Sequence, residues 1–321
     1  MRKVTILGAG AYSIALSRIL SKNGAKVTLY TKFAEEKELL DRERGNDKVL
    51  PNVKLMNNTS VSDNLEESVK DCELIIIAVP SNVVRSTMQD LKLFYASQIL
   101  CIASKGVEQG TGYFMDQVIR EEVSDAKLCA LSGPSYAAEV SNFLPTVVTV
   151  AGASEATNLL SEYFSNNRFK VEQTTDVRGV LVCGALKNIL AIGAGILSAL
   201  DAGDDALTAL ITGGVREVGV FQSVLGGEHE TVYLSCGIGD TVVTCAGGLS
   251  RNKELGKLIG QGKTVEEAIK VQGKTVEGYT ALLGVKKIAI EKNLNLPILQ
   301  TICNIVLDGE KTDLLSDAIC K

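Results

Sequence analysis

The feature that most constrains the fold is a strand, a glycine turn and a helix at the start of the chain. Residues 4–20 are VTILGAGAYSIALSRIL, in which a β-branched run is followed by Gly8 and Gly10. The two glycines permit a tight turn and a close backbone approach, and the helix then begins near Ala11. This order predicts a parallel sheet with a dinucleotide pyrophosphate at the helix N-terminus. An ordinary turn between a strand and a helix, without a ligand, is the alternative interpretation.

The first half of the chain continues to alternate β-branched runs with helical patterns. Helices are expected at segments such as 12–23 and 113–122. Besides residues 4–7, strands are expected at 26–30, 74–79, 99–103, 128–131 and 147–150. Strands that alternate with helices indicate an α/β Rossmann-type domain, in which right-handed crossovers join parallel strands.

The pattern changes near residue 176, after which long apolar segments of helical period replace the strands. The sequence TVEE at 264–267 is a capping box that begins one of these helices. The helical segments are 177–201, 204–225, 264–271, 277–292 and 297–308. We therefore expect two domains, a dinucleotide-binding Rossmann-like domain at 1–178 and an all-helical substrate and catalytic domain at 179–321.

Composition excludes several classes of function. The net charge is −5 and no basic block is longer than two residues, which argues against a nucleic-acid surface. No stretch matches the roughly 20 apolar residues of a spanning helix, so no membrane insertion is expected. The eight cysteines include no C-x-x-C pair, and none is spaced with the single histidine for zinc. Most lie in apolar runs, which predicts a cytoplasmic protein without a metal.

One cation, Lys187, interrupts the apolar run CGALKNILAIGAGI at 183–196. An unpaired buried ammonium is costly, so this lysine either extends to solvent or is held half-buried for chemistry. The only histidine, His229, lies in an acidic glycine loop and has the character of a surface residue. A desolvated lysine is a natural proton donor in its place, because burial lowers the pKa of the ammonium. Asp240, in an apolar and glycine-rich context, is its expected partner.

The residues after the second expected strand bear on the choice of nucleotide. The segment is LYTKF, with no acid at the position that would hold a ribose 2′-hydroxyl, and with Lys32 nearby. A cation suits the 2′-phosphate of NADPH, so the sequence favours NADPH over NADH. A solvated surface lysine is the alternative.

Five further motifs resemble those of one enzyme family. They are SKGVEQGTG at 104–112, LSGPSYAAEV at 131–140, ALKNILAIGAGI at 185–196, GIGDTVVTCAGGLSRN at 237–252 and VEG at 276–278. In this order and spacing the chain is similar to NAD(P)-dependent sn-glycerol-3-phosphate dehydrogenase. The resemblance implies a Rossmann domain followed by a helical domain, and a homodimer. It also implies reduction of dihydroxyacetone phosphate to sn-glycerol 3-phosphate, the backbone for bacterial phospholipid synthesis.

The resemblance assigns roles to individual residues. Lys187 is the catalytic acid or base, and Asp240 and Lys105 complete the catalytic set. The implied substrate-binding residues are Lys105, Gly133, Ser135, Lys187, Asn188, Asp240, Thr244, Ser250, Arg251 and Asn252. Gly8, Gly10 and Lys32 are already candidate cofactor-binding residues. The resemblance adds further ones, which are Ala11, Tyr12, Lys105, Ala137, Arg251 and Glu277. The hydroxyl, guanidinium and amide of residues 250–252 suit a phosphate, although a plain helix start also explains Ser250.

Some positions depart from the family pattern. Ala11-Tyr12-Ser13 replaces the usual Ser-Trp-Gly, which bears on how the cofactor phosphates are held. Asp205, Leu207 and Gly213 also depart, in a segment that bears on helix packing or a dimer contact. Two other functions stay open. One is a β-hydroxyacid or ketopantoate-type NADPH reductase, whose substrate has a carboxylate in place of the phosphate; the other is a dinucleotide-binding regulator without turnover.

Overall fold

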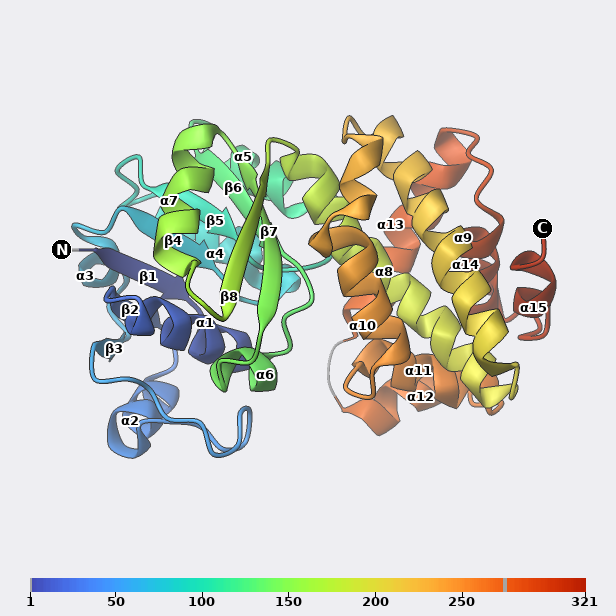
Figure 1. Ribbon diagram of the computed structural model, residues 1–321, viewed down its shortest axis with the longest axis horizontal. Helices are drawn as coiled ribbons and strands as arrows, with labels where there is room; N and C mark the ends of the chain where they lie inside the picture. The colour runs from blue at the N-terminus through green and yellow to red at the C-terminus, as the bar shows by residue number, and fades with distance from the viewer. Residues whose placement is uncertain (1, 274–275) are drawn as a thin grey trace. The chain divides into compact units, whose positions relative to one another are not determined.

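The computed structural model describes residues 2–273 and 276–321, which form two compact units (Figure 1). The first unit contains the residues up to Ser104 together with Met115–Val177. The second contains Lys105–Phe114 and Arg178–Lys321. The sequence-based division assigned residues 105–114 to the first domain, whereas the structure assigns them to the second unit. The reason is packing, because Phe114 is buried and the guanidinium of Arg178 lies over its ring.

An eight-stranded sheet forms the centre of the first unit, in the order β3-β2-β1-β4-β5-β6-β7-β8. All neighbouring pairs are parallel except β6 and β7, so the last two strands run opposite to the other six. The strands are β1 (Lys3–Leu7), β2 (Lys26–Tyr30), β3 (Thr59–Ser62), β4 (Leu74–Ile77), β5 (Ile99–Ile102), β6 (Lys127–Ser132), β7 (Thr146–Gly152) and β8 (Phe169–Thr174). The expected α/β Rossmann-type domain is confirmed, with this one antiparallel pair as a correction.

Helices cover the sheet of the first unit. They are α1 (Ala11–Lys22), α2 (Ala34–Glu43), α3 (Leu65–Val69), α4 (Val84–Leu91), α5 (Met115–Glu122), α6 (Ala137–Ser141) and α7 (Ser154–Phe164), with a 3-10 turn at Ser81–Val83. α1 packs against α6 and α7, and α4 packs against α5. The strands β1, β4 and β5 are buried along almost their whole length, as expected where helices cover both faces of a parallel sheet.

Among its described residues, the second unit contains helices, short turns and one isolated bridge between Val107 and Phe114. The helices are α8 (Val177–Ala199), α9 (Gly203–Val224), α10 (Asp240–Ala246), α11 (Arg251–Gly260), α12 (Val265–Gln272), α13 (Glu277–Glu291), α14 (Pro297–Asp308) and α15 (Leu314–Ala318), with the turns η2 (His229–Tyr233) and η3 (Ser235–Gly239). The expected capping box is present, since the Thr264 and Glu267 side chains each accept a backbone N–H of the other residue. The predicted all-helical C-terminal region is confirmed.

The central helix of this unit is α8. It is long and apolar enough to cross a membrane by length and composition alone, but its apolar window is completely buried, as in a core helix. Its backbone comes into close contact with the backbone of α11. A Cβ on Gly195 would lie 1.9 Å from the carbonyl oxygen of Lys253, and one on Gly256 would lie 1.9 Å from that of Ile192. These glycines therefore fix the place of α11, whose first turn contains the SRN segment.

Candidate active site

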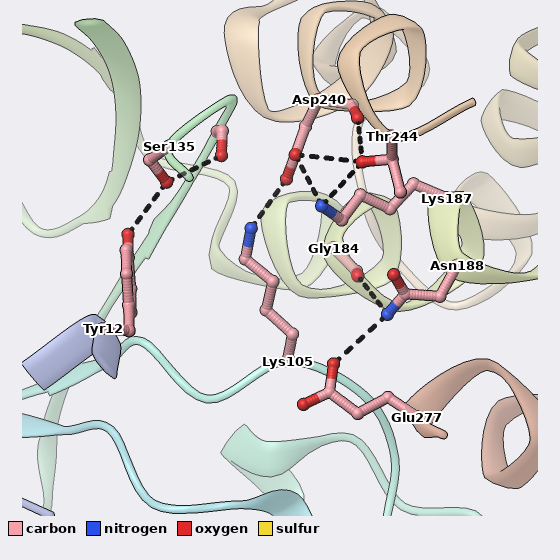
Figure 2. Close-up of polar contacts among 10 residues, drawn as sticks. Tyr12, Lys105, Ser135, Gly184, Lys187, Asn188, Asp240, Thr244 and Glu277 are labelled. Atoms are coloured by element: carbon pink, nitrogen blue, oxygen red, sulfur yellow. Dashed lines mark hydrogen bonds and ion pairs between the residues drawn. The ribbon is translucent and has the colours of Figure 1, made fainter. Parts of the chain in front are cut away.

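Lys187 does not extend to solvent. It lies in the middle of α8 and is only 7% exposed. Its ammonium donates to Oδ1 of Asp240 at 2.5 Å and to Oγ1 of Thr244 at 3.0 Å (Figure 2). Thr244 gives its own proton to the backbone carbonyl of Asp240, so it acts as an acceptor toward the lysine. The ammonium is thus held by two groups of one helix, α10.

A second lysine shares the same carboxylate. Nζ of Lys105 donates to Oδ2 of Asp240 at 2.7 Å, while Asp240 itself is 1% exposed. Two ammonium groups therefore flank one buried carboxylate, one on each oxygen (Figure 2). When all three groups are ionised, the cluster has a net charge of about +1, which suits an anionic substrate or a developing alkoxide.

Burial and charge act in opposite directions in this cluster. Burial lowers the pKa of Lys187 to about 8; Asp240 acts to raise it again, and Lys105 lowers it further. Burial alone would raise the pKa of Asp240, but the two ammonium groups together hold it below its ordinary value. The carboxylate therefore stays ionised near neutral pH, where Lys187 is close to the point at which it releases a proton.

The chain reaches Asp240 through an unusual turn. The segment η3 is one π-helical turn, and Asp240 follows it as the first residue of α10. A Cβ on Gly237 would lie 2.2 Å from the carbonyl oxygen of Val232, so the turn requires glycine at this position. The N-terminal turn of a helix also favours a carboxylate electrostatically. Single π turns occur often at functional sites, and here one positions the central acid of the cluster.

Two other segments of the second unit are joined by hydrogen bonds next to Lys187. Nδ2 of Asn188 donates to the carboxylate of Glu277 at 3.4 Å. Oδ1 of Asn252 accepts from the backbone N–H of Gly278 at 2.9 Å, and a Cβ on Gly278 would meet this oxygen at 2.6 Å. Burial raises the pKa of Glu277, while the charge of Arg251 acts to lower it. The SRN and VEG segments are therefore held together through their polar atoms.

The start of α11 has features of both a phosphate site and a plain helix start, the two interpretations of residues 250–252. Oγ of Ser250 accepts from the backbone N–H of Lys253 at 3.2 Å and so caps the helix. Asn252 is buried, whereas Arg251 is exposed. A helix N-terminus with an exposed guanidinium favours an anion. Ser250 and Asn252 therefore stabilise the local structure, as a helix cap and as an acceptor for the Gly278 N–H, in addition to any contact with a ligand.

In the first unit, the glycine turn has the geometry that a pyrophosphate requires. Gly8 has φ +109, and its missing Cβ would lie 3.1 Å from the carbonyl oxygen of Ala78. Gly10 is the N-cap of α1, and a Cβ there would meet nothing within 4 Å. Open space beside the N-cap residue of a helix is compatible with the phosphates of a dinucleotide, which helix N-termini favour. Ser13, the departure from the glycine pattern, is fully buried.

A carboxylate that sequence reasoning missed lies next to the residue that follows β2. Lys32 is exposed, with its ammonium 5.9 Å from the ring centre of Phe33. Thr31 donates from Oγ1 to the carboxylate of Glu36 at 2.5 Å. Glu36 comes from the first turn of α2, six residues after the strand. Glu36 does not directly follow the strand, so the available sequence signal is an acid in the first turn of the next helix.

The remaining predicted residues of the first unit surround one loop. Gly133 and Ser135 lie between β6 and α6, Ala137 is the first residue of α6, and Tyr12 reaches this loop from α1. Of the departures in the second unit, Asp205 lies in the first turn of α9, where an acid suits the helix dipole. A Cβ on Gly213 would lie 2.5 Å from Cδ1 of Ile298, so this glycine lets α9 and α14 approach.

Two family models match almost the whole chain. The model for the N-terminus of NAD-dependent glycerol-3-phosphate dehydrogenase matches residues 3–158, and the model for its C-terminus matches residues 176–316. The chain belongs to this family. The membership predicted from the five motifs is confirmed, and with it the assignment as an NAD(P)-dependent oxidoreductase.

Individual relatives agree with the family models. A protein of Fusobacterium nucleatum named glycerol-3-phosphate dehydrogenase (NAD(P)+) is 37% identical over 314 residues, which are 97% of this chain and 94% of the relative. The crystal structure of glycerol-3-phosphate dehydrogenase from Coxiella burnetii has a TM-score of 0.92 at 30% identity, and covers 100% of this chain and 99% of that one. A ketopantoate reductase from Ralstonia eutropha shares the fold alone, with a TM-score of 0.61 at 16% identity over 99% of this chain and 100% of that one.

Proposed function

We propose that this protein reduces dihydroxyacetone phosphate to sn-glycerol 3-phosphate with NADH or NADPH. The observation that supports this most directly is the buried cluster of Lys187, Asp240 and Lys105, which offers a proton donor next to a fixed negative charge. Relatives that are named for this activity and share more than a third of their residues with the chain support the choice of substrate. The ketopantoate-type alternative has only a shared fold in its favour.

The cluster accounts for the proton that carbonyl reduction needs. The bound nicotinamide cofactor supplies a hydride to the carbonyl carbon. Lys187 donates a hydrogen bond to the carbonyl oxygen and transfers a proton as negative charge develops there, so that an N–H bond breaks and the alcohol O–H bond forms. Asp240 keeps Nζ in place and stabilises the ammonium before transfer. Lys105 adds positive charge beside the oxygen.

Arg251 is proposed to bind the substrate phosphate. It is exposed at the N-terminus of α11, where the guanidinium and the helix dipole both favour an anion. Binding energy from the phosphate would place the carbonyl for reaction. Asn188, Thr244, Ser250 and Asn252 complete the proposed substrate set from the second unit, and Gly133 and Ser135 complete it from the first.

The proposed cofactor contacts follow the same division. Gly8, Gly10, Ala11 and Tyr12 would hold the pyrophosphate at the start of α1, with Ala137 beside them in the first unit. Lys105, Arg251 and Glu277 are the proposed cofactor contacts from the second unit. Lys32 favours NADPH, while the Glu36 carboxylate at the same strand end lets NADH remain a substrate.

Three broader features are also proposed. The product would enter glycerophospholipid synthesis, the enzyme would be cytoplasmic, and it would act as a homodimer. The family resemblance supports the first and the third. The second is supported by the cysteines, of which seven out of eight are buried in the manner of small hydrophobic residues.

The test follows NAD(P)H absorbance with dihydroxyacetone phosphate, unphosphorylated dihydroxyacetone and ketopantoate, in the wild type and in Arg251→Ala. We expect the wild type to reduce dihydroxyacetone phosphate far better than the other two ketones. Charge-assisted hydrogen bonds contribute about 1.5–3 kcal/mol, so the variant should raise KM for the phosphorylated ketone by roughly ten- to a hundredfold or more. Preference for ketopantoate, or no turnover of any ketone, would contradict the proposal. If Arg251→Ala lowers kcat/KM equally for dihydroxyacetone phosphate and for dihydroxyacetone, Arg251 does not bind the phosphate.

A further inference from the structure

A chain of hydroxyl groups links the glycine turn of the first unit to the loop after β6. The phenol oxygen of Tyr12, in the first turn of α1, lies 3.0 Å from Oγ of Ser135 (Figure 2). Oγ of Ser135 in turn donates to the backbone carbonyl of Gly133 at 2.9 Å. Both bonds lie within one unit, and both serve residues that the proposed function assigns to cofactor or substrate.

Counting protons gives the direction of these bonds. A serine hydroxyl has a single proton and two lone pairs. Ser135 gives its proton to the carbonyl of Gly133, so the proton between Tyr12 and Ser135 comes from the phenol. Oγ of Ser135 therefore accepts one bond and donates one. What it can still offer a ligand is a lone pair, and not a proton.

Packing holds the residues at both ends of this series of hydrogen bonds, Gly133 and Tyr12. Gly133 has φ +147, and a Cβ there would lie 2.9 Å from Cα of Val148 on β7, so its backbone is pressed against the sheet. Tyr12 packs against the hydrophobic core of the first unit, on a helix whose neighbour α6 begins directly after the loop. The acceptor for the serine proton and the donor to the serine oxygen therefore both have fixed positions.

We propose that Tyr12 is a positioning residue that keeps Ser135 a hydrogen-bond acceptor toward the free hydroxyl of the substrate. The inference rests on the proposed function, and it concerns which part of the substrate Ser135 contacts. An ionised phosphate offers acceptors only, so it has no proton for Ser135. The hydroxymethyl group of dihydroxyacetone phosphate has a proton to give. Ser135 thus selects ketone phosphates with a hydroxyl beside the carbonyl.

Hydroxyacetone phosphate is the matched probe, because it keeps the carbonyl and the phosphate and replaces the free hydroxyl by hydrogen. The quantity measured is the ratio of kcat/KM for dihydroxyacetone phosphate to kcat/KM for this analogue. The variants are Ser135→Ala, Tyr12→Phe and the double variant. Tyr233→Phe is the control, since it removes an exposed phenol from the second unit. Thermal unfolding and nucleotide affinity are measured for each protein.

The wild type should favour the hydroxylated ketone. A neutral hydrogen bond changes an equilibrium by about two- to twelvefold, so Ser135→Ala and Tyr12→Phe should each lower the ratio by a factor in this range. The double variant should lower it no further than Ser135→Ala does, because Tyr12 acts through the serine. Tyr233→Phe should leave the ratio unchanged.

Three results would overturn the inference in an active enzyme: an unchanged ratio in Ser135→Ala, equal losses of both ketones in Tyr12→Phe, or effects that multiply in the double variant. If Tyr12→Phe does not fold, Ser135→Ala alone decides, since that change removes one partly exposed hydroxyl. A wild type that turns over neither ketone overturns the proposed function itself, and so the two failures are distinguishable.

Discussion

At the scale of single residues, the charge state of Lys187 determines when the enzyme can act as an acid. Burial brings its pKa to about 8, so the ammonium predominates below that pH and is lost above it. We predict that kcat for ketone reduction is level between about pH 6 and 7 and falls above about pH 8, by up to tenfold per pH unit. Asp240→Asn removes a group that raises this pKa and leaves Lys105 nearby. The break in the profile should therefore move to lower pH in the variant, and a break that stays in place or moves to higher pH would contradict this account.

Lys32 is the second residue whose role can be measured directly. It is exposed, so its contact with a 2′-phosphate should contribute about 1 kcal/mol, or roughly fivefold in kcat/KM. We predict a modest preference for NADPH, which Lys32→Asp reverses because the new carboxylate repels the 2′-phosphate. Lys26→Asp makes the same charge change at the other end of β2 and should leave the ratio unaltered. If the wild type prefers NADH, Lys32 is only a surface lysine.

At the scale of helices, the backbones of α8 and α11 come close together at Gly195 and Gly256. A Cβ on Gly256 would overlap the carbonyl of Ile192, so Gly256→Ala must separate the two helices. Overpacking of this kind costs about 1–3 kcal/mol, and α11 also positions Arg251. We predict a lower Tm together with a higher KM for dihydroxyacetone phosphate. Gly248→Ala is the stability control, because its Cβ would meet nothing within 4 Å. A normal Tm and KM in Gly256→Ala would show that the helices adjust freely.

The start of α14 depends on a carboxylate from α9. Glu217 accepts the backbone N–H groups of Ile298 and Leu299, each at 2.8 Å, in place of a cap from the helix itself. Burial raises the pKa of this carboxyl from 4.5 to about 7, although the two backbone bonds act to lower it. The folded state therefore binds the proton more tightly than the unfolded state. The resulting stabilisation is complete below about pH 4.5 and is lost as the pH rises through 7.

Glu217→Gln tests this linkage, because glutamine does not titrate. We predict that the wild type loses about 2–4 kcal/mol of unfolding free energy relative to the variant between pH 4.5 and 8. Urea unfolding of both proteins across this range gives the difference. A difference that is constant with pH would mean that the carboxyl titrates alike in the folded and unfolded chain.

At the scale of the whole molecule, the sequence was sufficient for features that depend on local pattern. The glycine turn, the helical second half and the unusual Lys187 follow from periodicity and burial. The strands β3 and β8 were missed, since TSVS and FKVEQT are too polar to stand out as buried runs. The reversal of β7 depends on pairing between segments that are far apart in the sequence, and no local pattern encodes it. The carboxylate of Glu36 is only five residues from Thr31, so its signal was local, an acid in the first turn of the next helix. The π turn before Asp240 also rests on a nearby contact, between Gly237 and Val232.

The central role in the proposed reduction of dihydroxyacetone phosphate is that of Lys187 as the proton donor. The decisive measurement is kcat for this ketone in Lys187→Ala, with nucleotide affinity and Tm measured in parallel. Lys287→Ala, which removes an exposed lysine of α13, is the control and should retain wild-type kcat. General acid catalysis contributes about 10²–10⁴-fold, so we predict a loss of kcat in this range with nucleotide affinity nearly unchanged. A Lys187→Ala enzyme that folds, binds the nucleotide and keeps most of its kcat would contradict the account.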